Sequence, residues 1–364
     1  MRIAVVSGGP VDPQFSGSQS RVCSLIHALL EQGHGVVHAH FEATGYDRAP
    51  FLRGLSAVYP ALRLEGHIHA DRRLTDCAAV ILTNFWIEPE LEAALNLVDG
   101  FRGRTGPTIV FDSMDCLATT YIGTWPDERI RRFAALEAEL RAKSKLSVFI
   151  SRCEVLKALR LCPGLRESDT FVLSNCYDPS VDRRLFDDRQ HICFVGSAAP
   201  HNTTAAIFFL GRVWSRLARL IPEAEFHLVG SVGATLKIDG PAELIERVRT
   251  VGLVADLAEV LGGYRVSVVP VLTGSGIKDK TLESMARGTP VVTSVNGVEG
   301  MPLTHNQNVV LATEDSFAAA VAALYRDRPR WEQISAEGVR LVERRFSTRI
   351  FRDRVRRLIE RIQR

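Results

Sequence analysis

Two lysines and a glutamate lie close together in the stretch GSGIKDKTLE, which runs from Gly274 to Glu283. Lys278 and Lys280 carry positive charges, and Glu283 follows Lys280 at the three-residue spacing that places both side chains on one helix face. Glycines ahead of a helix let backbone N–H groups approach an anion, which the start of the helix also attracts. The stretch therefore fits a nucleoside diphosphate, with the lysines and N–H groups on the phosphates and Glu283 on the ribose hydroxyls.

The same residues also fit a charged surface loop that precedes an ordinary helix. Two common nucleotide-binding motifs are missing from the sequence, because it has no G-x-x-x-x-G-K-[ST] phosphate loop and no G-x-G-x-x-G dinucleotide fingerprint. Their absence counts against a P-loop enzyme and against a Rossmann dehydrogenase.

Short apolar runs rich in β-branched residues alternate with longer stretches of helical periodicity. Apolar residues recur on one helical face from Val22 to Leu30 and from Ala206 to Leu220. We expect further helices at residues 90–98 and 127–143, a short one near 51–58, and otherwise irregular chain from 42 to 75. The expected strands are residues 3–6, 36–41, 78–82, 108–111, 147–150, 171–173, 192–195, 224–230 and 266–271. Runs of this kind suit parallel strands covered by helices on both faces.

This pattern stops and restarts across the polar segment NCYDPSVDRRLFDDRQ, Asn175–Gln190, which is typical of a linker. A chain of 364 residues is long enough for two domains. We therefore predict two doubly wound α/β domains, at residues 1–183 and 190–345. Ligands of open α/β sheets bind beyond the carboxyl ends of the strands, and the glycine turn at Gly274 follows such an end.

Composition narrows the class of protein. A hydrophobic share of 46% and a charged share of 24% are ordinary for a globular protein, and a net charge of +3 argues against a general nucleic-acid binder. The seven cysteines are scattered without metal-ligand spacing, which predicts reduced thiols and no metal site. The sequence shows neither a signal segment nor an apolar run of spanning length. We therefore expect a cytoplasmic protein, at most peripheral to a membrane.

Positive charge gathers at the end of the chain. Residues 340–364 hold ten arginines against Glu343, Asp353 and Glu360. Such a run is usually the solvated face of a helix. The alternative is a contact with anionic lipid, which attracts arginine at about 1 kcal/mol per charge.

The stretch GSGIKDKTLESMARGTPVV resembles the donor-site motif of the retaining glycosyltransferases of family 4 (glycosyl transferases group 1), which have the GT-B fold. Four more segments resemble that family in the same order along the chain. They are SGGPVDPQFSGSQSRVCSLIHALLEQGHGV, FVLSNCYD, ICFVGSAAPHNTTAAIFFLGRVW and VGLVADLAEVLGGYRVSVVP. The resemblance implies two Rossmann-like domains facing a cleft, with a helix at about 347–364 packing back on the first domain.

By this resemblance, Lys280 contacts the donor diphosphate, Lys278 is the basic residue two places earlier, and Glu283 binds the ribose. The family's other acidic residue, which contacts the transferred sugar, corresponds to Ser275, so that carboxylate is missing here. The Arg and Lys that often follow the first strand of this domain are missing too, which leaves Lys278 and Lys280 with more of the phosphate. The remaining residues implied at the donor site are Gly196, His201, Gly274, Gly276, Ile277, Thr281 and Leu282, although His201 fits a polar loop equally well.

In the first domain, the resemblance and the strand ends together suggest an acceptor site. Asp115 is our candidate for orienting or deprotonating the acceptor hydroxyl, with Asp112 as its partner, although both also fit simple turn caps. Gly17 lies in the N-terminal loop, where its backbone N–H is expected to meet the diphosphate or the acceptor, and Arg21 lies one turn into the following helix. A simple turn glycine and an exposed helix arginine are the alternatives. Asn84 and Trp86 end another strand, and Trp86 also fits a core position.

The implied activity is transfer of a sugar from a nucleotide sugar, UDP- or GDP-linked, to an acceptor hydroxyl with retention of configuration. It would need no metal or other cofactor. The implied acceptors are a glycan, a lipid-linked sugar or a small molecule. The alternatives are a GT-B relative with another activity, such as a nucleotide-sugar epimerase or a glycan phosphorylase, and a binding protein without turnover.

Overall fold

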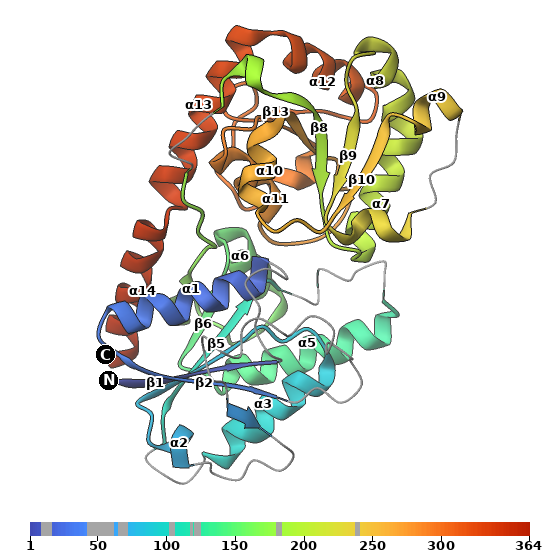
Figure 1. Cartoon of the computed structure of the whole chain (residues 1–364). Helices are drawn as coiled ribbons and strands as arrows, with labels where there is room; N and C mark the ends of the chain where they lie inside the picture. Colours follow the sequence, from blue (N-terminus) through green and yellow to red (C-terminus); the bar gives the residue numbers. More distant parts are fainter. Residues whose placement is uncertain are drawn as a thin grey trace. The chain divides into compact units, whose positions relative to one another are not determined.

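The computed structural model describes residues 1–8, 17–41, 62–64, 72–101, 106–116, 119, 125–179, 184–236 and 241–364. The chain divides into two compact units (Figure 1). The first comprises Met1–Cys176 and Thr348–Arg364, and the second comprises Tyr177–Ser347. The first domain is therefore built from both ends of the sequence.

The first domain contains a seven-stranded sheet in the order β3-β2-β1-β4-β5-β6-β7. All its pairings are parallel, and the chain starts at the centre and winds outward in both directions. The strands are β1 (Arg2–Ser7), β2 (Gly35–Phe41), β3 (Leu62–Leu64), β4 (Ala79–Thr83), β5 (Thr108–Met114), β6 (Leu146–Phe149) and β7 (Thr170–Val172).

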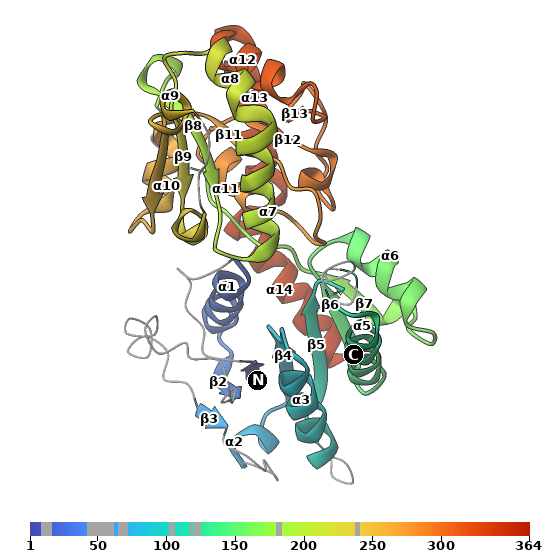
Figure 2. The same cartoon turned by 90° about the vertical axis from the view of Figure 1, so that its right-hand side faces the viewer.

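Helices cover both faces of this sheet (Figures 1 and 2). Alternation along β1 sends Ile3 and Val5 into one core, which includes α1 and α14, and Ala4 and Val6 into the other, which includes α3 and α5. This two-sided burial explains why the strands are almost purely apolar. The helices are α1 (Gly17–Glu31), α2 (Arg72–Thr75), α3 (Glu88–Gly100), α5 (Asp127–Ala142), α6 (Arg152–Leu161) and α14 (Thr348–Gln363).

The second domain repeats this plan with a six-stranded sheet in the order β10-β9-β8-β11-β12-β13. Its pairings are also parallel. The strands are β8 (Gln190–Val195), β9 (Phe226–Val229), β10 (Val248–Gly252), β11 (Tyr264–Val269), β12 (Val291–Thr293) and β13 (Val310–Leu311).

One long helix of this domain changes its winding in the middle. It runs from α7 (Pro200–Phe208) through a π-helical segment (Phe209–Trp214) into α8 (Ser215–Leu220). Phe209 in that segment packs against Phe226 of β9, with ring centroids 4.6 Å apart. The other helices are α9 (Ala242–Ile245), α10 (Leu257–Gly263), α11 (Asp279–Ala286), α12 (Phe317–Arg326) and α13 (Arg328–Arg345).

The predicted fold class, two parallel sheets each covered by helices, is confirmed. The expected strands all form, with ends shifted by at most three residues. The expectations did not include β10, β12 and β13, the helices α6, α9, α10, α12 and α13, or the short β3 and α2 within the stretch expected to be irregular. The helix expected near residues 51–58 lies outside the described residues.

None of the seven cysteines forms a disulfide. In the described part of the chain, no helix is both long and apolar enough to cross a membrane.

Candidate functional site

The stretch with two lysines lies where the parallel sheet predicts, just beyond the carboxyl end of β11. The chain leaves β11 at Val269, turns through Gly274 and Gly276, and enters α11 at Asp279 with Lys278 as the residue before the helix. The two glycines have φ values of +108° and +73°, in the left-handed region that side chains disfavour. The backbone of this loop therefore depends on glycine at these two places.

Lys278 folds back on this loop. Its ammonium donates hydrogen bonds to the carbonyl oxygens of Gly274, Ser275 and Gly276, at 3.3, 2.8 and 2.9 Å. Among the described residues, the backbone N–H groups of Gly274 and Ile277 have no acceptor. The loop thus has its carbonyls bound internally and keeps backbone donors for a ligand.

Lys280 is held from two sides. Its ammonium donates to the side-chain oxygen of Asn202 and lies 5.2 Å from the centre of the Phe194 ring, at the end of β8. Burial and the neighbouring charge of Lys278 lower the pKa of Lys280 to about 8. No carboxylate neutralises it at contact distance in the described structure, so an arriving phosphate would be its natural counter-ion.

Glu283 lies one turn further along α11 and is partly buried. Burial, with a smaller contribution from Asp279, raises the pKa of its carboxyl group to about 7. Within the described residues, no hydrogen bond or ion pair involves this carboxylate. A carboxylate and an ammonium with pKa values displaced in opposite directions are typical of a binding or catalytic site.

Three other residues expected at the donor site are Thr281, Leu282 and Gly196. Thr281 and Leu282 are fully buried, and the Thr281 hydroxyl donates to the carbonyl of Gly297, so their side chains pack inside the domain. Gly196 lies so close to Asn202 that an added Cβ would be 3.1 Å from it.

His201 is the second residue of α7, and its side chain is exposed to solvent. Crowding by nearby protein atoms and the charges of Lys280 and Lys278 nevertheless lower the pKa of its imidazole. The ring is therefore neutral near pH 7 and offers one donor and one acceptor rather than a charge.

In the first domain, Arg21 and Asp112, which were expected separately at the acceptor site, are both buried. The Arg21 guanidinium forms a two-pronged salt bridge with the Asp112 carboxylate and donates to the carbonyl of Leu173 at 2.8 Å. Thr83 adds a hydrogen bond to the same carboxylate. These groups satisfy one another at the carboxyl ends of β4, β5 and β7, so their role is to hold the strands together.

Asn84 and Trp86 are joined at the end of β4. Asn84 has φ +60°, and its side-chain oxygen accepts a 2.6 Å hydrogen bond from the Trp86 indole. The Asn84 amide nitrogen is buried and has no acceptor in the part of the chain that the structure describes. Asp115 follows β5 and is partly buried, and Gly17 is the first residue of α1.

Two features missed from the sequence support this site. Asn202 orients Lys280, and its side-chain nitrogen donates to Ser197 at 3.1 and 3.2 Å. Tyr177, at the domain boundary, donates a 2.5 Å hydrogen bond to Asp279 between the two lysines. Because both partners lie far apart in sequence, local spacing carries no signal for either contact.

A second group of polar residues lies at the opposite ends of the strands. His191, Glu225 and His227 offer ligand atoms within 4.8 Å of one another, which is a spacing that a metal ion accepts. They are bonded among themselves, however, and Arg249 pairs with Glu225 at 3.2 Å. The adjacent guanidinium opposes a cation, so we assign the group a structural role.

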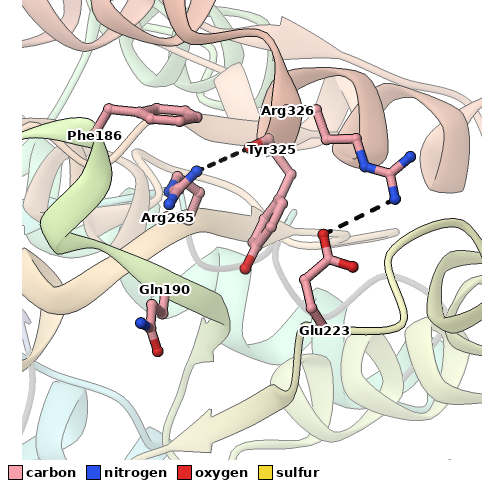
Figure 3. A pocket seen from close by; sticks show the side chains of 6 residues that line it. All are labelled: Phe186, Gln190, Glu223, Arg265, Tyr325 and Arg326. Atoms are coloured by element: carbon pink, nitrogen blue, oxygen red, sulfur yellow. Dashed lines mark hydrogen bonds and ion pairs between the residues drawn. The ribbon is translucent and has the colours of Figure 1, made fainter.

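A pocket of about 450 Å³ opens near these amino ends (Figure 3). The Arg265 guanidinium carbon lies 3.7 Å from the centre of the Phe186 ring, and the same guanidinium donates to the backbone carbonyl of Tyr325. The Arg326 guanidinium lies 3.9 Å from the Glu223 carboxylate, measured from nitrogen to oxygen. Gln190 at the start of β8 completes the lining. In a parallel sheet all strands have their amino ends on the same side. This pocket therefore lies at the opposite ends of the strands from Lys280 and is distinct from the donor site.

Comparison with known proteins agrees with the fold. Residues 189–327 match the family Glycosyl transferases group 1. No curated protein matches the sequence significantly. The similarity to solved structures is therefore one of fold, since sequence identity to the three described next is below 20%.

HepE from Anabaena, solved with UDP and glucose, is 13% identical with a TM-score of 0.72, covering 98% of this chain and 99% of that one. Sucrose-phosphate synthase from Thermosynechococcus elongatus is 18% identical with a TM-score of 0.73, covering 99% and 98%. An alpha-glucosyltransferase solved with UDP is 11% identical with a TM-score of 0.64 and full coverage of both chains. The chain thus has the GT-B fold of these glycosyltransferases, and its second domain matches the Glycosyl transferases group 1 family.

Proposed function

We propose that the protein transfers a sugar from a nucleoside-diphosphate sugar to a hydroxyl group of an acceptor. The observation that carries this proposal is the presence of Lys280 and Glu283 three residues apart on α11, inside the segment that matches the family. Lys280 supplies a desolvated positive charge for the diphosphate. Glu283 supplies an unengaged carboxylate for the ribose hydroxyls.

The chemistry follows from where charge develops. The bond between the anomeric carbon and the diphosphate oxygen breaks, and that carbon forms a new bond to the acceptor oxygen. The acceptor proton leaves to the released phosphate or to a nearby base, for which Asp115 is our candidate. Negative charge grows on the leaving phosphate, where Lys280 and the loop N–H groups stabilise it, and removing one such donor costs about 10²-fold in rate.

Retention of configuration and independence of metal are parts of the same proposal. Attack from the side of the leaving group needs no carboxylate nucleophile, and Lys280 with the backbone donors provides the charge that a divalent ion provides elsewhere. Proton NMR of the product would give the anomeric configuration. Activity that survives EDTA is the expected result, and loss of activity restored by one added metal would contradict this part.

A UDP-sugar is the first donor to test, and GDP-sugars are the second. HepE was solved with UDP-glucose and the alpha-glucosyltransferase with UDP. In a thermal-shift series with UDP, GDP, dTDP and ADP, a ligand at a hundredfold excess over its Kd stabilises the fold by about 2.7 kcal/mol. A shift with one nucleotide, followed by turnover of its sugar, would support the proposal. If a nucleotide shifts the melting temperature but its sugar is neither transferred to any acceptor nor hydrolysed, the protein is a binding protein instead.

The acceptor class we favour is a glycan or lipid-linked sugar presented at an anionic membrane surface. The exposed face of α14 carries Arg349, Arg352, Arg356 and Arg357, while its apolar face is buried in the first domain. Flotation with phosphatidylglycerol vesicles would test the contact, with neutral vesicles and a variant carrying glutamine at these four positions as controls. Equal binding to neutral vesicles would contradict it, and a water-soluble acceptor such as a small sugar would then be tested first.

A further inference from the structure

The lysine that precedes α11 uses its whole hydrogen-bonding capacity within the protein. A lysine ammonium has three N–H donors and no acceptor. Lys278 directs its ammonium to three carbonyl oxygens, those of Gly274, Ser275 and Gly276. No N–H of this ammonium remains for a phosphate while the loop keeps this form.

These three hydrogen bonds fix the direction of three peptide units. A trans peptide is planar, and its C=O and N–H point in opposite directions. The structure contains no cis peptide bond in its described residues. The carbonyls of Gly274, Ser275 and Gly276 therefore turn the N–H groups of Ser275, Gly276 and Ile277 away from the Lys278 ammonium. A single side chain thus orients a row of backbone donors.

The glycines make this convergence possible. Successive carbonyls of an extended chain alternate in direction, and three in a row reach one point only if the backbone curls. The φ values of +108° at Gly274 and +73° at Gly276 supply that curl. Only glycine adopts such values at low cost, so the loop sequence Gly-Ser-Gly and Lys278 act as one unit.

We infer that Lys278 is a positioning residue of the donor site, which holds the Gly274–Ile277 loop in the form that turns the backbone N–H of Ile277 toward the nucleotide sugar. This inference rests on the proposed function and gives the two lysines different roles in it. Lys280 is the lysine that contacts the diphosphate. The Lys278 ammonium stays on the loop carbonyls, and the loop contributes a backbone N–H donor to the bound nucleotide sugar.

A first experiment needs only the wild-type protein. NMR spectra of the lysine ammonium groups are recorded without ligand and then with UDP. We expect the Lys278 ammonium signal to be protected from exchange in the free protein and little changed by UDP, while the Lys280 signal shifts. A Lys278 signal that is unprotected in the free protein, or that shows coupling to phosphorus when UDP is added, would overturn the inference.

Two substitutions separate positioning from charge. Lys278→Met removes the charge, whereas Lys278→Arg keeps it but spreads its donors over a planar fork that does not match three converging carbonyls. If Lys278 positions the loop, both variants bind UDP about tenfold more weakly. If it contacts phosphate by charge, Lys278→Arg binds like wild type, and the inference fails. Circular dichroism confirms that each variant is folded.

The loop itself is measured in the absence of ligand, with Lys280→Met as the matched control. Nitrogen relaxation at Ser275, Gly276 and Ile277 should show larger motion in both Lys278 variants and wild-type rigidity in Lys280→Met. Unchanged rigidity in the Lys278 variants would overturn the inference. If wild type binds neither UDP nor GDP, the proposed function fails, and this measurement without ligand still decides whether Lys278 orders the loop.

Discussion

The ammonium of Lys280 and the amide oxygen of Asn202, 78 residues apart in the sequence, are joined by a hydrogen bond. This bond connects the start of α11 to the start of α7, and so ties together the loops that follow two neighbouring strands, β11 and β8. It also accounts for a charged lysine in a partly buried place, because the amide oxygen replaces part of the lost hydration.

Changing Asn202 should shift the pH at which the donor site fails. Lys280 has its pKa lowered to about 8, so its positive charge and its hold on a diphosphate are lost as the pH rises through that value. Asn202→Asp places a carboxylate beside the ammonium, raises its pKa and extends UDP binding to higher pH. Asn202→Leu removes the acceptor, lowers the pKa and ends binding at lower pH.

The check on Asn202 is the Kd for UDP between pH 6 and pH 10. Titration of the nucleotide's own phosphate is common to wild type and both variants, so only the differences count. Identical pH profiles in all three proteins would show that Asn202 does not tune Lys280.

Glu283→Gln should stabilise the ligand-free protein in a pH-dependent way. The pKa of Glu283 is raised from its usual value of 4.5 to about 7, so the folded state holds a proton that the unfolded state releases between these values. Wild-type stability therefore falls as the pH rises from 4.5 to 7. Glutamine stays neutral, so we expect its advantage in urea unfolding to be small at pH 4.5 and largest above pH 7, together with weaker UDP binding. An equal advantage at both pH values would contradict the raised pKa.

Removing one partner of the Arg21–Asp112 pair should strongly destabilise the first domain. Both side chains are essentially inaccessible to solvent, so Arg21→Met leaves a buried carboxylate without its counter-charge. The expected loss is about 3–5 kcal/mol in the free energy of unfolding. The double variant Arg21→Met/Asp112→Leu should recover much of this loss, because it removes both charges. A single variant within 1 kcal/mol of wild type, at about the level of a surface substitution, would be the contrary result.

Two glycines of the second domain separate the cost of a positive φ from the cost of steric overlap. Gly230 has φ +91°, and an added Cβ would lie 2.4 Å from the carbonyl oxygen of Gly196. Gly252 has φ +77° with nothing within 4 Å of such an atom. Gly252→Ala should cost about 1–2 kcal/mol for the backbone alone. Gly230→Ala should cost roughly 3 kcal/mol or more, because the overlap adds to the strain. Equal losses in chemical denaturation would show that the Gly196 loop moves aside without penalty.

The sequence predicted what depends on local pattern. Buried parallel strands need continuous apolar runs, and these runs located six strands of the first sheet and β8, β9 and β11 of the second. The runs of β3, β12 and β13 are only two or three residues long, and β10 is mostly exposed, so these four strands were missed. The missed α6 carries a start signal in Ser151, whose hydroxyl accepts a hydrogen bond from the Glu154 backbone, and that signal could have been recognised. The π-helical turn at Phe209 has no such signal, because it depends on how the aromatic rings pack against β9 and α12.

The donor loop could be located from its glycines, lysines and glutamate, but the directions of its side chains could not. Lys278 and Lys280 look alike in the sequence, yet one turns back to the loop carbonyls and the other reaches Asn202. Arg21 was expected either at the acceptor site or as an exposed arginine on its helix. Its burial depends on Asp112, 91 residues away, which no local pattern reveals.

The position of α14 has a consequence for the order in which the protein can be made. Five of its side chains, Phe351, Val355, Leu358, Ile359 and Ile362, complete the core formed by α1 and β1. A ribosome makes this helix only after the whole second domain, so the first domain stays without one layer while the second can already fold. Its unfinished apolar face is exposed throughout that interval. The domain synthesised first should therefore be the last to become resistant to protease on the ribosome.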